Sequence, residues 1–232
     1  PKADSGYLSL FGEPGLATLK GTATQGDQGV KCTDGDVTVD NGRLFLRDLI
    51  FDNFTYCIHY YEAFTKTHEV EITNCIFKGS QVGIGLRSDN LNRAVIRGNQ
   101  FLNINYAGTA GNDCNGIMCG NVNTPDYTNG KYWIEDNEFV TINNPNGSNA
   151  EVHAIWCTGG TGYIRNNRIS TVAGPSAGDG AEAIYTKLRY GYIENNYILD
   201  GGHGQGAITI KGTVLQSVIK NNVIKPVFRR YN

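Results

Sequence analysis

The sequence lacks the features that define several common protein classes. Its 232 residues contain no run approaching the roughly 18 apolar residues of a membrane-spanning helix, so no membrane span is predicted. The net charge is −2 and no basic run is present, so nucleic acid is not an expected partner. No segment keeps a helical hydrophobic period. Cysteine pairs with zinc-site spacing are also absent, so no metal site is predicted.

The sequence does contain one short phrase, repeated seven times: an apolar residue, two variable residues, usually Asn, one variable residue and an apolar residue. The Asn copies are Ile96–Phe101, Ile134–Phe139, Ile164–Ile169, Ile193–Ile198 and Ile219–Ile224. Two earlier copies, Leu46–Phe51 and Ile72–Phe77, hold Leu49 and Cys75 in the Asn position. Successive copies start 24 to 38 residues apart, which is typical of a repeat architecture.

Each repeat is too short to bury a core alone, so the repeats must stack. Short runs of Ile, Val, Phe and Tyr bounded by Gly and Asn predict strands. Parallel coils about 4.8 Å apart would let one Asn amide bond the next, which places the Asn column at an inner corner. A further strand per repeat is marked by inward isoleucines, with the next residue and the third pointing outward. These isoleucines are Ile58, Ile84, Ile117, Ile155, Ile184 and Ile208.

With these repeats the chain resembles right-handed parallel β-helix proteins of the pectate-lyase-like superfamily, which includes polysaccharide lyases, polygalacturonase-like hydrolases and phage tailspikes. The resemblance implies an all-β solenoid of about seven to eight coils with three strands each. Residues 1–42 are predicted to form irregular N-terminal coils or a partial cap, and residues 43–232 one continuous β-helix. The C-terminal end of this domain is expected to continue in a longer chain or to need a partner.

The six cysteines do not form a close-spaced disulfide framework. Several fall within or beside strand-like runs, so they are predicted to be reduced, buried residues. Cys119 and Cys157 share an inward column in successive repeats, which leaves a disulfide between them as an alternative.

The interval between the phrase and the next strand is 12 residues in the first two repeats, 20 or 21 in the next three, and 15 from Ile193 to Ile208. Three long loops at one corner would form a wall beside the outer face of the Ile58–Ile208 sheet. Functional residues often lie on such loops. In the resembled family, polysaccharide runs along this sheet.

Candidate catalytic residues gather at the ends of these loops and on the sheet beside them. They are Asp113, Glu151, Asp179, Glu182, His203 and Lys187. The candidate substrate-binding residues are His59, Arg87, His153, Trp156, Tyr185 and Lys211. Trp156 and Tyr185 are expected to form an exposed aromatic pair that suits the apolar faces of sugar rings.

Hydrolysis of a glycosidic bond needs two carboxylates, and stacked coils bring several within reach of each other. We therefore expect a polysaccharide-binding glycoside hydrolase that needs no cofactor. Gly202-His203-Gly204 is similar to the Gly-His-Gly of polygalacturonases, although the chain lacks their adjacent Asp-Asp pair.

Two alternatives remain. A uronate lyase would use Arg87, Lys187 or Lys211 as base and neutralising cation, in some cases with calcium. A non-catalytic phage tailspike or surface adhesin, for which a homotrimer would be in keeping, would only bind glycans. All three hypotheses place the protein outside the cell, on a cell surface or on a virion.

Overall fold

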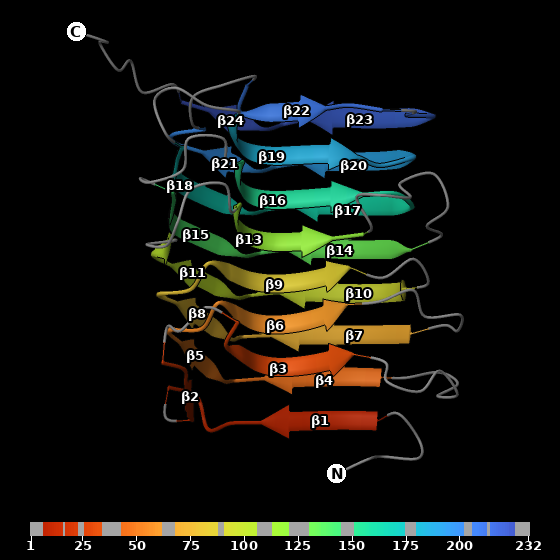
Figure 1. Ribbon diagram of the computed structural model, residues 1–232. Helices are drawn as coiled ribbons and strands as arrows, with labels where there is room; N and C mark the ends of the chain where they lie inside the picture. The colour runs from red at the N-terminus through yellow and green to blue at the C-terminus, as the bar shows by residue number, and fades with distance from the viewer. Residues whose placement is uncertain are drawn as a thin grey trace, which may run out of the picture.

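The computed structural model describes residues 7–15, 17–22, 26–33, 43–61, 68–87, 91–105, 113–120, 130–144, 151–174, 180–201, 206–212 and 214–225. These residues form three sheets in which every strand pair is parallel (Figure 1). Each coil adds one strand to each sheet, so the predicted all-β parallel solenoid with three strands per coil is confirmed. Within the described ranges, no helix is long and apolar enough to cross a membrane.

Sheet A contains β1 (Tyr7–Phe11), β4 (Arg43–Arg47), β7 (His68–Thr73), β10 (Leu91–Arg97), β14 (Lys131–Glu135), β17 (Thr161–Arg165), β20 (Tyr190–Glu194) and β23 (Gln216–Lys220). Sheet B contains β2 (Thr18–Lys20), β5 (Ile50–Asp52), β8 (Ile76–Lys78), β11 (Gln100–Leu102), β15 (Glu138–Asn143), β18 (Arg168–Ala173), β21 (Tyr197–Ile198) and β24 (Val223–Ile224), and β12 (Ile104–Asn105) pairs with β15. Sheet C contains β3 (Gln28–Thr33), β6 (Tyr56–Tyr61), β9 (Val82–Arg87), β13 (Cys114–Cys119), β16 (Val152–Thr158), β19 (Ala181–Lys187) and β22 (Ile208–Ile210).

The described parts of the N-terminal segment already belong to this stack. Strands β1, β2 and β3 pair in parallel with β4, β5 and β6 and so form the first coil. The described parts of the two chain ends lie at opposite ends of the solenoid, with sheet C facing the viewer in Figure 1.

The predicted Asn ladder lies at the corner between sheets A and B. Asn137 Nδ2 donates to Asn167 Oδ1 at 3.0 Å, and Asn167 Nδ2 donates to Asn196 Oδ1 at 3.0 Å. A left-handed bend lies at the residue before each ladder Asn, for example Asp136 with φ 56° and Asn166 with φ 55°. The ladder residue therefore supplies hydrogen bonds, and its predecessor turns the chain.

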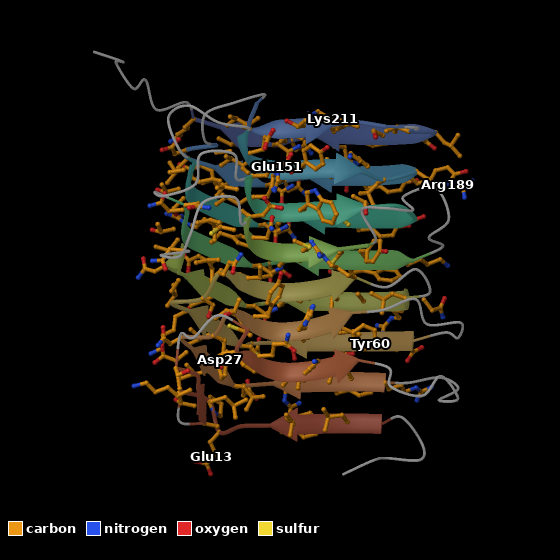
Figure 2. All side chains as sticks on the ribbon, in the orientation of Figure 1. Glu13, Asp27, Tyr60, Glu151, Arg189 and Lys211 are labelled. Carbon is orange, nitrogen blue, oxygen red and sulfur yellow. The ribbon has the colours of Figure 1, made fainter. Side chains whose placement is uncertain are left out.

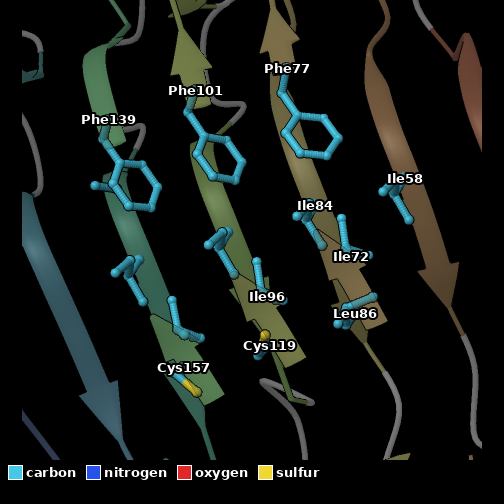
Figure 3. Packing of buried hydrophobic residues seen from close by; sticks show 14 of the residues in the cluster. Ile58, Ile72, Phe77, Ile84, Leu86, Ile96, Phe101, Cys119, Phe139 and Cys157 are labelled. Carbon is cyan, nitrogen blue, oxygen red and sulfur yellow. The ribbon is translucent and has the colours of Figure 1, made fainter. Parts of the chain in front are cut away.

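The core is filled by in-register columns of side chains, and one of these columns consists of phenylalanines (Figure 3). The rings of Phe51, Phe77, Phe101 and Phe139 form one stack, with centroids 5.2, 5.0 and 4.6 Å apart from coil to coil. Gly116 in sheet C faces this stack, because a Cβ added there would lie 2.7 Å from the Phe139 ring. The in-register columns of the sequence are thus the packing units of the core.

The described cysteine side chains are all free thiols, and all are buried: Cys57, Cys75, Cys114, Cys119 and Cys157. The prediction of reduced, buried cysteines is confirmed for them, and the alternative Cys119–Cys157 disulfide does not form. Burial raises the pKa of the Cys57 thiol to about 12, so this group stays protonated and unreactive in the folded protein.

Candidate functional site

The strict alternation of inward and outward side chains breaks near the start of the sheet C strands. Ala154 and Ile155 are consecutive residues of β16, yet both are fully buried in the core. This kink puts His153 before it and Trp156 after it outside the core. The neighbouring strands β13 and β19 have an outward polar residue at the same position, since His153 pairs in register with Asn115 and with Glu182. The outer face of sheet C therefore begins with a polar row made of Asn115, His153 and Glu182.

His153 lies at the centre of this polar row and is only 2% exposed at its side chain. Its Nδ1 lies 3.0 Å from Asn115 Oδ1. An amide oxygen only accepts, so Nδ1 carries a proton and donates to it. Its Nε2 lies 3.1 Å from Oε2 of Glu182, whose side chain is 3% exposed.

The His153–Glu182 contact joins two buried groups that can each carry a charge. It is an electrostatic contact rather than an aligned hydrogen bond, because Nε2 has no partner in hydrogen-bonding geometry. The pair places a buried imidazole beside a buried carboxyl group on the outer face of the sheet.

Glu151 lies at the edge of the His153–Glu182 pair and is the accessible carboxylate, with 47% of its side chain exposed. Its Oε2 is 4.0 Å from His153 Nε2. The Glu151 and Glu182 oxygens facing His153 are thus at most about 7 Å apart, a limit that admits retaining glycosidase pairs and the shortest inverting ones.

Asp113 plays a supporting part at this edge. Its Oδ1 accepts a hydrogen bond from the Glu151 backbone N–H at 3.1 Å, and its carbonyl accepts one from Gln81 Nε2 at 2.9 Å. Asp113 therefore fixes the backbone that presents Glu151.

The expectation of an exposed aromatic pair is wrong. Trp156 and Tyr185 are each 5% exposed and form a small cluster with Met118, separate from the core. In-register stacking is the reason, because each side chain is covered by its neighbours in the next coils. Tyr185 is further flanked by the His153 ring, with centroids 5.1 Å apart. These aromatics consequently form a supporting layer without open faces for sugar rings.

Two lysines lie beside this layer. The ammonium groups of Lys187 and Lys211 are 5.6 and 5.4 Å from the centroid of the Tyr185 ring. Figure 2 shows Lys211 and Glu151 on the part of the ribbon that contains β16, β19 and β22. Both lysines thus adjoin the polar row through a single tyrosine.

His59 and Arg87 lie farther along the same sheet, on β6 and β9. His59 stacks on Tyr56 with centroids 4.5 Å apart, and burial, followed by the charges of Arg87 and Lys31, lowers its pKa. Arg87 Nε donates to Met118 Sδ at 2.8 Å. Arg87 therefore reaches the cluster of Met118, Trp156 and Tyr185, which in turn flanks His153.

The structure thus brings together Asp113, Glu151, His153 and Glu182, with Trp156, Tyr185, Lys187 and Lys211 beside them. Asp179 and His203 lie outside the described residues. The partner that sequence reasoning missed is Asn115. It precedes its inward isoleucine by two residues, as His153 and Glu182 do, so aligning the coils would have found it. Among the side chains that the structure describes, no three His, Cys, Asp or Glu residues are placed to hold a metal ion.

Comparisons with known proteins add no identification. No family model matches the chain, no curated protein matches it, and no solved structure matches it. The fold and the arrangement on sheet C therefore carry the functional argument alone.

Proposed function

We propose that the protein binds a polysaccharide along the outer face of sheet C and hydrolyses it there. The observation that carries the proposal is the buried His153–Glu182 pair with the exposed Glu151 carboxylate at its edge. A buried polar group costs free energy unless it is compensated, so a structural role alone does not favour such a pair over apolar side chains. Polysaccharides of this kind are met outside the cell, on its surface or by a virion.

In this proposal Glu151 is the group that reaches the substrate. As an acid it donates a proton to the glycosidic oxygen while the bond from that oxygen to the anomeric carbon breaks. Glu151 regains its proton from solvent, to which 47% of its side chain is exposed, and His153 and Glu182 lie behind it. Water adds its hydroxyl group to the anomeric carbon, and its remaining proton passes to a second carboxylate, for which Glu182 and Asp179 are the candidates.

The test is incubation with a panel of neutral and acidic polysaccharides, following both new reducing ends and ultraviolet absorbance. Hydrolysis produces reducing ends without absorbance. Glu151→Gln and Glu182→Gln should each lower the rate at least about 100-fold, because a positioned acid or base contributes that much. Glu138→Gln is the matched control, since Glu138 is a 40% exposed carboxylate on sheet B. Full activity in both site variants would contradict the assignment.

The same assay separates the other two candidate functions. Absorbance from an unsaturated uronate would indicate elimination and would move the catalytic role to the lysines. Binding without either signal would identify a glycan adhesin. Protein concentration dependence in sedimentation, measured alongside, reports whether the active form is a single chain or a homotrimer.

A further inference from the structure

The outer face of sheet A carries a row of aromatic side chains that the proposed function does not use. Trp133, Tyr163 and Tyr192 pair in register on β14, β17 and β20, and all three are half-buried. Their rings stack, with centroids 5.5 and 5.0 Å apart and interplanar angles of 19° and 11°. Tyr190, at the start of β20, is 38% exposed. The row therefore leaves a stripe of apolar ring edges on the surface.

The stacking of the row limits what it can contact. Each ring covers the face of its neighbour, and the Arg93 guanidinium lies 5.8 Å from the centroid of the Trp133 ring at the end of the row. The row thus has no open face for a sugar ring, whereas a flat stripe of ring edges suits another protein surface. Its composition agrees, because tryptophan, tyrosine and arginine are the residues enriched in protein interfaces and in their hot spots.

A ladder of alternating charge runs beside the aromatic row. The register places its members one above another in the order Arg97, Glu135, Arg165, Glu194 and Lys220. Neighbours pair within the chain, since Arg165 Nε and Lys220 Nζ each lie 3.1 Å from an oxygen of Glu194, and Arg97 pairs with Glu135. Removing one partner of a buried ion pair is costly, but here each charge keeps a partner when the face is covered. The ladder can therefore be buried in an interface.

The ladder is complementary to itself when a second copy runs in the opposite direction. Two solenoids can face each other through sheet A across a two-fold axis that lies between β17 and β20, parallel to the strands. This operation reverses the second solenoid end for end and keeps the strands of the two sheets aligned, as in face-to-face sheet packing. The two aromatic rows then meet each other. In the two ladders, Arg165 lies opposite Glu194 of the second copy, and Glu135 lies opposite its Lys220.

We propose that two copies of this chain associate as an antiparallel dimer through the outer faces of sheet A, with the row of Trp133, Tyr163 and Tyr192 at the centre of the interface. The inference does not depend on the proposed function, which concerns sheet C. Figure 1 shows sheet A behind sheet C, so the dimer leaves the outer face of sheet C open in both copies.

The experiment is sedimentation equilibrium of the full chain over a wide range of protein concentration, in which the wild type should follow a monomer–dimer equilibrium. Tyr163→Lys should weaken the dimer at least roughly tenfold, because it places a charge among the central aromatic residues that contribute most to such interfaces. Tyr197→Lys is the matched control and should leave the dimer unchanged. Tyr197 is also a half-buried tyrosine beside cations, but it lies on sheet B.

Charge reversal tests the antiparallel register. Arg165→Glu alone and Glu194→Arg alone each place like charges opposite each other across the two-fold axis, so each variant should dimerise at least roughly tenfold more weakly. An equimolar mixture of the two variants restores opposite charges at both contacts and should restore a dimer that contains one copy of each. Circular dichroism of each variant confirms that it is folded.

The other outcomes overturn the inference at different points. A wild type that is monomeric at every concentration, or that forms trimers, overturns the dimer. A dimer that survives Tyr163→Lys overturns its placement on sheet A. A dimer that both charge reversals leave unchanged, or that the mixture does not restore, overturns the antiparallel register. Polysaccharide hydrolysis by a monomeric wild type would leave the proposed function intact while the dimer fails.

Discussion

The Asn ladder allows one prediction to be worked through in energetic terms. Asn167 is 1% exposed, and its Oδ1 accepts from both the backbone N–H and the Nδ2 of Asn137. The substitution Asn167→Ala leaves the Asn137 backbone N–H without an acceptor and leaves Asn137 Nδ2 only its bond to the Ile96 carbonyl. A buried unsatisfied group costs about 1–3 kcal/mol and a lost hydrogen bond about 1 kcal/mol, so the free energy of unfolding should fall by about 2–4 kcal/mol. A loss of this size is a large share of the stability of a typical domain.

The assay is urea denaturation followed by far-ultraviolet circular dichroism. The matched control is Asn222→Ala, which removes the same two bonds to Asn196 at a partly buried end of the ladder. Water can replace a lost acceptor there, so the control should lose about 1 kcal/mol or less. Equal losses in the two variants would refute the reasoning, because burial would then have no part in the cost.

Two further predictions concern packing and pH. Gly116→Ala would place a Cβ 2.7 Å from both the Ala154 carbonyl oxygen and the Phe139 ring, so it should destabilise the fold by about 1–3 kcal/mol in the same urea assay, and an unchanged midpoint would contradict the packing described. The His59 pKa is lowered, mainly by burial, from its ordinary value of 6.5, so the unfolded chain binds the proton more readily and stability should fall as pH drops below about 6.5. In a proton NMR titration, Arg87→Gln should move the His59 pKa back toward 6.5, because it removes a nearby positive charge. A His59 titration at or above 6.5 in the wild type would contradict the burial described.

The fold was predictable because each repeat obeys the same constraint. In a parallel stack equivalent residues lie one above another, so a column of Asn or Phe in the sequence becomes a ladder or a ring stack in space. The left-handed bends lie at Asp136 and Asn166, one residue before the ladder, because the ladder amide must itself point inward to reach its neighbours.

The sequence allowed us to predict which residues of the candidate site lie next to each other, but not how exposed their side chains are. Register alone brought Glu151, His153 and Glu182 together, since it depends on counting residues from Ile155 and Ile184. Alternation could not show that Ala154 and Ile155 both turn inward, which places His153 outward against Glu182. The same stacking that aligns Trp156 with Tyr185 also covers their faces. In the proposed function, a polysaccharide would therefore meet the rims of these columns, where the Glu151 carboxylate lies on one side and the two lysine ammonium groups lie on the other.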